Sequence, residues 1–243
     1  MGDVGTVGEV GNLRVGRRFG MASAVTVAVA VVVSAALAVT TPPRSGPYCR
    51  SGCLTRPWTD AASFVPRDYW WMYPMLVLLL AAVALAVTVH GMAPAERAPA
   101  GLTGVLLGTA ATTLLVAGYG IQLVMVQPAL LAGEGGDLVL WSQYNPHGLF
   151  IALEDVGYAV WGLAFVLLGS TMARRRRGAA SAAGWALLAG GTLTLVALVA
   201  YALGYRSALD YRFEVTAIAL TWLTLGVTAV LVVLTLRRPA PRH

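Results

Sequence analysis

Glu154 and Asp155 form an acidic pair where an apolar stretch of the sequence begins. Carboxylate groups that enter a membrane span are costly, so they usually have a partner, a water-filled cavity or a function. Three kinds of chemistry fit such a pair: binding of a ligand or ion, salt bridges that clamp helices together, and general acid–base catalysis. The sequence contains no P-loop, HExxH, GxSxG or dinucleotide-binding motif, so no motif indicates a reaction.

The residues around the acidic pair have helical spacing. If the helix starts upstream of His147, separations of seven and four residues place His147, Glu154 and Tyr158 within about 40° of arc. Asp155 then points to the next face. Asn145–Pro146 is expected to begin this helix, because proline is tolerated in the first turn and asparagine can cap free amide groups. Carboxylates near a helix N-terminus also interact well with the helix dipole, which explains the pair without a function.

Distances along the predicted helices place these carboxylates at the outer membrane boundary. Arg174 is expected to mark the cytoplasmic boundary, and Asp155 lies nineteen residues before it, about 28 Å along a helix. The hydrocarbon core of a bilayer is about 30 Å thick. The same measure taken from Arg237 puts Glu214 about 34 Å away, also at the outer edge.

Polar residues from four predicted spans, including Asp68-Tyr69 at the start of the second, therefore share one level, where they can form a common site. The predicted ligand-binding residues are Gln122, His147, Glu154, Asp155, Arg212 and Glu214. Arg212 is expected to bridge to Glu154 or Asp155 on a neighbouring helix. No residue is assigned to catalysis or to a metal, and no cofactor is expected.

Three functions are open for this cluster. The leading hypothesis is a membrane protein that binds or transports a small molecule or ion at its outer face. The first alternative is a structural or accessory protein in which the cluster is a salt-bridge clamp. The second is an intramembrane enzyme with Glu154 as general acid or base and His147 as its partner. The sequence shows neither a nucleophile nor a metal site beside them, so it favours a protein that is not an enzyme.

The composition indicates an integral membrane protein. Hydrophobic residues make up 58% of the 243 residues and charged residues 12%, with a mean hydropathy of +0.72. Soluble domains average about 25% charged residues. The net charge of +6 does not indicate nucleic-acid binding, because the arginines lie at the ends of apolar segments. The predicted fold is an all-α, polytopic transmembrane helix bundle in the plasma membrane, in contact with the lipid bilayer.

Six apolar segments have the length that a bilayer requires. They are approximately Met21–Thr40, Trp70–His90, Leu102–Val126, Leu149–Met172, Ala182–Leu203 and Val215–Leu236. Eleven arginines, including the run Arg174–Arg177, fall on one side of these spans and six on the other. The positive-inside rule then places both termini in the cytoplasm.

The predicted tails are residues 1–20, a flexible N-terminal tail, and residues 239–243. A basic segment, an apolar run and Ala36-Leu37-Ala38 also resemble a secretory signal with its cleavage site. The apolar run is longer than a typical signal core, so a retained first span is favoured.

Cys49 and Cys53 are the only cysteines, and both lie in the first predicted extracytoplasmic loop, residues 41–69. An oxidising compartment favours a local disulfide between them. Free thiols, redox exchange and metal binding are the alternatives. The CxxxC spacing differs from a CxxC redox motif, and no histidine lies nearby to complete a metal site.

Small residues recur along the third predicted span. Gly101, Gly104, Gly108 and Thr112 form a stripe on one helix face. Such a stripe lets a second helix approach closely, so it is interpreted as a packing surface.

The chain from Asp68 to about Arg238 resembles a family of uncharacterised bacterial membrane proteins with six predicted spans. The resemblance rests on Tyr144-Asn145-Pro146-His147-Gly148, on Glu154 with Gly157-Tyr158, and on Tyr211-Arg212-Phe213-Glu214. It implies a six-span membrane fold. It transfers no catalytic role, because the family has no established activity.

Overall fold

The computed structural model describes residues 5–134, 138–173 and 178–237. The α-helices in these residues are α1 (Gly5–Val39), α2 (Met72–Gly91), α3 (Ala98–Ile121), α4 (Gln127–Leu131), α5 (Leu149–Met172), α6 (Ala179–Tyr205) and α7 (Arg212–Arg237). Short 3₁₀ turns occupy parts of the connections, and none of the described residues lies in a β-strand. The predicted all-α fold is confirmed.

Six helical segments are long and apolar enough to cross a membrane. They are Gly16–Val39, Arg67–Gly91, Ala95–Leu131, Leu149–Met172, Ala179–Ala208 and Arg212–Arg237. Their number agrees with the six predicted spans. The third segment is the longest, because a π-helical turn at Gln122–Val126 joins α3 to α4 without ending the helix.

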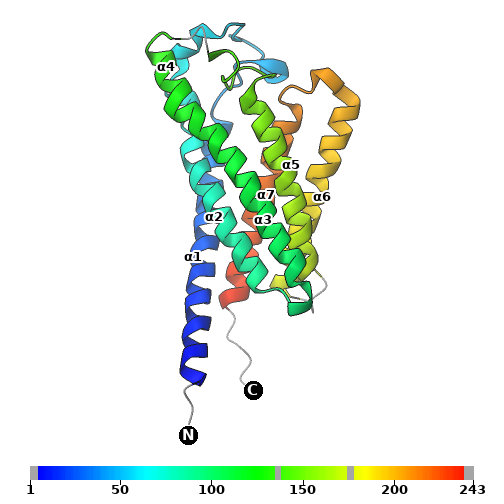
Figure 1. Ribbon diagram of the computed structural model, residues 1–243. Helices are drawn as coiled ribbons and strands as arrows, with labels where there is room; N and C mark the ends of the chain where they lie inside the picture. The colour runs from blue at the N-terminus through cyan, green and yellow to red at the C-terminus, as the bar shows by residue number, and fades with distance from the viewer. Residues whose placement is uncertain (1–4, 135–137, 174–177, 238–243) are drawn as a thin grey trace.

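The helices form an elongated bundle (Figure 1). The start of α1 and the finish of α7 lie at the same end, which we call the terminal end. The opposite end, the cap end, is covered by residues 40–71 and 138–148, which together we call the cap. An even number of spans requires this arrangement of the termini, whereas the side of the membrane that they occupy stays a prediction.

α5 is the central helix, in contact with α3, α6 and α7, while α1 packs on α2 and α7. Glycines make these contacts close. On α3, Gly104 faces Leu168 and Gly108 faces Trp161, so larger residues there would meet the α5 side chains. The small-residue stripe is thus a packing surface, as the sequence indicates.

Large apolar side chains cover the outside of the bundle. On α6, Leu193, Val196, Val199 and Leu203 are all more than half exposed. Aliphatic side chains directed outward along membrane-length helices suit contact with lipid. The surface is therefore compatible with a bilayer around the bundle.

The start of the chain differs from the prediction. Residues 1–20 were expected to form a flexible tail, but α1 is helical from Gly5. No proline occurs before Pro42, and a helix that has formed extends readily in both directions when no breaker interrupts it. Hydropathy locates the apolar part of this helix and not its first residue.

Buried polar contacts hold the cap together. Asp68 is 2% exposed and accepts hydrogen bonds from Arg44 Nε and from the Tyr144 hydroxyl, each at 3.2 Å. Ser45 and Tyr211 share a hydroxyl–hydroxyl bond of 2.8 Å. These contacts join both segments of the cap to each other and to the start of α7. Cys49 and Cys53 form a disulfide in the first segment, with their Cα atoms 5.8 Å apart.

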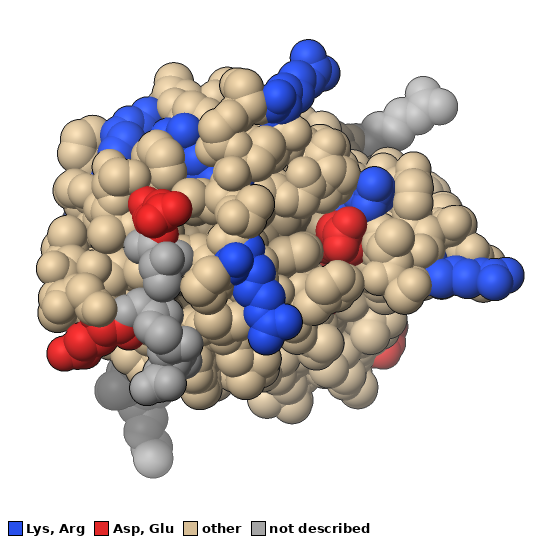
Figure 2. Space-filling view, turned by 90° about the horizontal axis from the view of Figure 1, so that it is seen from above, with Lys and Arg blue, Asp and Glu red and all other residues tan. Residues whose placement is uncertain are grey.

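Charged side chains are visible over the cap end when it is viewed along the bundle (Figure 2). Positive and negative groups are scattered among uncharged residues and do not gather in one patch. The surface charges alone therefore do not mark a site at this end.

Candidate functional site

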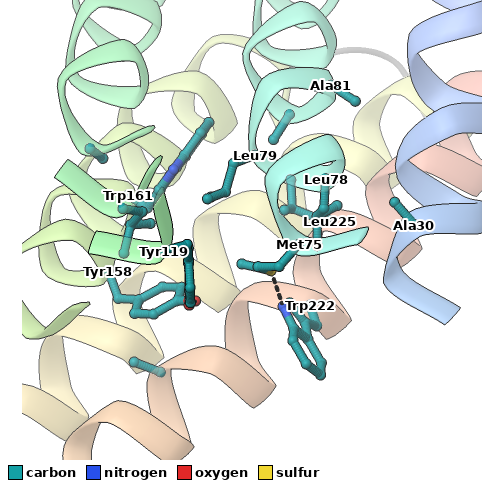
Figure 3. Close-up of a cluster of buried hydrophobic side chains, with 14 of the residues drawn as sticks. Ala30, Met75, Leu78, Leu79, Ala81, Tyr119, Tyr158, Trp161, Trp222 and Leu225 are labelled. Carbon is teal, nitrogen blue, oxygen red and sulfur yellow. Dashed lines mark hydrogen bonds between the residues drawn. The ribbon is translucent and has the colours of Figure 1, made fainter. Parts of the chain in front are cut away.

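Glu154 lies inside the bundle near the cap end and is 1% exposed. It is the sixth residue of α5, and its Oε1 accepts a hydrogen bond from the Tyr119 hydroxyl of α3. Tyr119 and Tyr158 are themselves joined by a hydroxyl–hydroxyl bond of 2.8 Å, and both are fully buried. Figure 3 shows these two tyrosines side by side in the cluster of buried side chains. The Tyr119 hydroxyl thus takes the place of water at this carboxyl group, and the Tyr158 hydroxyl supports Tyr119.

Glu214, the third residue of α7, is 7% exposed, and its carboxyl group lies within hydrogen-bonding reach of that of Glu154. Carboxylate oxygens only accept hydrogen bonds, so a bond between two carboxyl groups requires a proton on one of them. No N–H or O–H group of another described residue reaches Oε2 of either glutamate. We call Glu154 and Glu214 the carboxyl pair, and one proton shared between them would satisfy both unpartnered oxygen atoms.

Asp155 adds a third acidic group at this level. Its side chain is half-buried, and its Oδ1 atom has no hydrogen-bond partner among the described residues. Asp155 lies close enough for its charge to act on both glutamates. The site is thus rich in carboxyl groups, and a positive charge or a proton is needed to balance them.

Arg212 does not supply that positive charge. Its Nη1 atom donates to Asp210 Oδ2 at 3.2 Å and to the Ala208 carbonyl at 2.6 Å, and its guanidinium carbon lies 4.4 Å from the Tyr205 ring centre. The expected bridge from Arg212 to Glu154 or Asp155 is wrong. Asp210 sits in a tight turn with φ of 46°, directly before α7, and this local carboxylate pairs with Arg212 first.

His147 also lies apart from Glu154. α5 begins at Leu149 with Gly148 as its N-cap, so His147 is outside the helix and does not share the Glu154 face. Its side chain is 67% exposed, with Nε2 3.5 Å from Asp210 Oδ1. Asn145 does not cap the helix, because its Oδ1 accepts a hydrogen bond from the His147 backbone instead. A general acid–base pair of Glu154 and His147 is therefore not formed.

Gln122 is fully buried, and its amide is occupied by the cap. Nε2 donates to the Trp141 carbonyl, and Oε1 accepts from the Gln143 backbone at 3.1 Å. Gln122 thus fastens the second segment of the cap to the π-helical turn. No hydrogen bond given for Gln122 reaches the carboxyl pair.

Of the six predicted site residues, the structure brings Glu154, Asp155 and Glu214 together. It places His147 and Arg212 around Asp210, and Gln122 under the cap. Tyr119, which binds Glu154, and Tyr158, which binds Tyr119, were not among the predicted ligand-binding residues. The helical spacing of Glu154 and Tyr158 was a usable signal, but the sequence contained no signal for the approach of Tyr119.

The cap above the pair is held by tyrosine donors. Burial raises the pKa of Tyr144, and nearby Tyr69 and Asp68 raise it further. Burial also raises the pKa of Tyr211, outweighing its hydrogen bond with Ser45. Both hydroxyl groups therefore stay protonated at physiological pH, and Tyr211 also lies 3.1 Å from the Gln143 carbonyl.

The chain has no match among protein-family models, curated proteins or solved structures. The resemblance to a six-span bacterial family thus stays a prediction. Within the described residues, no group of three or more histidine, cysteine, aspartate or glutamate side chains is arranged to hold a metal ion.

Proposed function

We propose that this chain is a multi-pass membrane protein that binds a proton at the carboxyl pair and couples its exchange to movement of the helices around it, as in ion-coupled transport. The observation that carries the proposal is the close approach of two buried carboxyl groups, Glu154 and Glu214, whose Oε2 atoms have no other hydrogen-bond partner among the described residues. The proton is the bound ion in this proposal.

Electrostatics explains why a proton matters here. Two carboxylates in contact repel strongly in a medium of low dielectric constant. At the carboxyl pair, the nearest arginine on α7, Arg212, is already paired with Asp210. Loss of the shared proton would leave two negative charges at the junction of α5 and α7, with Tyr119 of α3 beside them. Repulsion would then favour separation of α5 from α7 at the cap end.

A structural clamp is the second candidate, and one observation favours it. The carboxyl pair and both tyrosines are almost completely buried and join α3, α5 and α7. A closed, fully bonded cluster can serve stability alone. In a clamp the proton is permanent, whereas in an exchange site it is lost and regained within the working pH range.

The pH dependence of unfolding distinguishes the two. Above the pH at which free glutamate ionises, the folded wild type holds one more proton than the unfolded chain. Stability must then fall as pH rises, by up to about 1.4 kcal/mol per pH unit. Glu214→Gln keeps a side chain that can donate to Glu154 but removes the shared proton, so its stability should depend less on pH.

Thermal unfolding of the two proteins in detergent between pH 5 and pH 9, which spans the physiological range, is the measurement. If the pair exchanges its proton, the fall in wild-type stability with rising pH should stop within this range, at the pH where the pair loses the proton. A slope that continues through the whole range supports the clamp. If the stability of wild type and of Glu214→Gln depended equally on pH, the shared proton would be contradicted, both as an exchange site and as a clamp. Asp60→Asn, an exposed acidic residue of the cap, is the control and should behave as wild type.

We also propose that the termini are cytoplasmic, that the cap is extracytoplasmic and that the membrane is the plasma membrane. The distribution of arginines supports this orientation. The disulfide in the cap supports it as well, because disulfides persist in oxidising compartments.

A further inference from the structure

The threonines of α7 fall into two groups. Thr216, Thr224 and Thr235 donate their hydroxyl groups to the carbonyl four residues earlier, as threonines in helices commonly do. Thr221 and Thr228 do not. Their Oγ1 atoms are buried without a hydrogen-bond partner in the described part of the chain, and the residues are 1% and 0% exposed.

Thr221 and Thr228 lie below Glu214 of the carboxyl pair along α7. Thr221 and Thr228 follow Glu214 by seven and fourteen residues, so they lie on nearly the same face of α7. On α5, Trp161 follows Glu154 by seven residues, and its indole N–H is likewise buried without a partner. Both helices run from the cap end to the terminal end (Figure 1). A row of unpartnered polar groups therefore leads from the carboxyl pair into the bundle.

A small cavity lies on this row. Its volume is about 10 Å³, and it is lined by Trp161, Thr228 and apolar residues of α2, α5, α6 and α7. This is close to the space that one water molecule needs. Figure 3 shows Trp161 within the cluster of buried side chains, and Trp161 and Leu225 both line the cavity. The indole N–H and the Thr228 hydroxyl are two groups to which such a water can bond.

His90 lies at the far end of the row. Ala82 and Ala86 of α2 line the cavity, and His90 follows Ala86 by four residues on the same face. His90 is half-buried in the last turn of α2, and its Nδ1 atom has no partner among the described residues. An imidazole can accept a proton on one nitrogen and release one from the other.

We propose that this row is a path that carries protons between the carboxyl pair and the terminal end. The inference rests on the proposed proton binding at the pair and extends it from a site to translocation across the membrane domain. Hydroxyl groups and water relay a proton by accepting one while releasing another. The indole N–H only donates, so Trp161 holds a water in place. One proton enters and one leaves, and no other reactant is required.

The spacing of the groups makes this transfer slow. Seven residues of helix span about 10 Å, which is longer than one hydrogen bond. Further water molecules therefore have to enter between Glu214, Thr221 and the cavity while a proton passes. The path is a leak or a coupled step and not an open channel.

Proton flux into vesicles tests the path. The full chain is reconstituted in phospholipid vesicles that contain a pH-sensitive dye, and a potassium gradient with valinomycin drives protons inward. Protein-free vesicles give the background. We expect the proton flux of wild type to exceed the background. The flux should fall about tenfold in Thr221→Val and in Thr228→Val, because each substitution removes a hydroxyl group to which a water molecule of the path can bond.

Thr224→Val is the matched control, because the Thr224 hydroxyl is buried but bonded to its own helix; its flux should equal that of wild type. Thr228→Val removes an unpartnered buried hydroxyl at constant shape, so we expect it to fold at least as well as wild type. Equal flux in all three variants, or equal loss in all three, overturns the path. Wild-type flux at background also overturns it, while the proton of the carboxyl pair, measured separately by pH-dependent unfolding, can still stand.

Discussion

At the scale of residues, the site depends on how each carboxyl group is neutralised. Asp68 has Arg44 and Tyr144, and Asp210 has Arg212 and His147. Glu154, in contrast, has the Tyr119 hydroxyl, and Glu154 and Glu214 have each other. An arginine beside a carboxylate fixes its charge, whereas a carboxyl pair keeps a proton that can be removed. The cap is thus suited to stability and the carboxyl pair to exchange.

Tyr119→Phe tests the contact that holds Glu154. The substitution removes the hydroxyl donor to Glu154 Oε1 and the bond to Tyr158, while the ring stays packed against Trp71 and Phe150. We expect unfolding in detergent to show a loss of about 1–3 kcal/mol, the cost of a buried acceptor left without its donor.

Tyr73→Phe is the control for this substitution, because Tyr73 is half exposed on α2 at the cap end. It should leave the free energy of unfolding unchanged within about 0.5 kcal/mol. Equal, small effects of the two substitutions would show that the Tyr119 hydroxyl does not support the carboxyl pair.

The sequence predicted the level of the acidic residues but not their partners. Counting along helices places Glu154 and Glu214 at one depth, because helix rise is constant. Which side chains contact these glutamates depends on the residue at which each helix begins. α5 starts two residues after His147, and Arg212 is the first residue of α7 beside a turn that presents Asp210. A shift of this size changes which side chains meet, and hydropathy does not resolve it.

At the scale of elements, glycine contacts set how closely α5 and α6 pack, and so how rigidly α5 holds Glu154. A Cβ atom on Gly169 would lie 2.6 Å from Leu188 N and 2.7 Å from the Gly184 carbonyl oxygen, both backbone atoms of α6. The helices would have to separate to admit it. Hydropathy predicted both helices, but it does not show that α5 and α6 pack against each other at these glycines.

Gly169→Ala should therefore destabilise the protein by about 1–3 kcal/mol, as overpacking usually does. Gly120→Ala is the matched control, since a Cβ atom there meets nothing within 4 Å and alanine favours the helix. Thermal unfolding of both variants in detergent is the measurement. A neutral Gly169→Ala would mean that α5 and α6 pack less closely than described.

At the scale of the whole molecule, the cap closes one end of the bundle and the chain termini lie at the other (Figure 1). The carboxyl pair lies near the cap end, so the orientation of the protein decides which side of the membrane is nearer to it. The disulfide closes a short loop, so its contribution to stability is small. The disulfide is instead useful as a marker of the side of the membrane on which the cap lies.

Labelling of cysteines in intact cells measures the orientation. After mild reduction, a membrane-impermeant maleimide should modify Cys49 and Cys53 without permeabilisation. In a background with both cysteines replaced by serine, Glu96→Cys, an exposed position between α2 and α3 at the terminal end, should react only after permeabilisation. The reverse pattern would place the cap in the cytoplasm and contradict the proposed orientation.

Infrared spectroscopy of the carboxyl groups tests the central claim most directly, because a protonated carboxylic acid has a C=O stretching band that a carboxylate lacks. Near neutral pH, wild type should show such a band. In the Glu154→Gln/Glu214→Gln double variant, the band should be weaker by the intensity that one protonated carboxyl group contributes. Asp60→Asn should keep the band unchanged. A double variant with the same acid band as wild type would contradict the shared proton, and with it the proposed function.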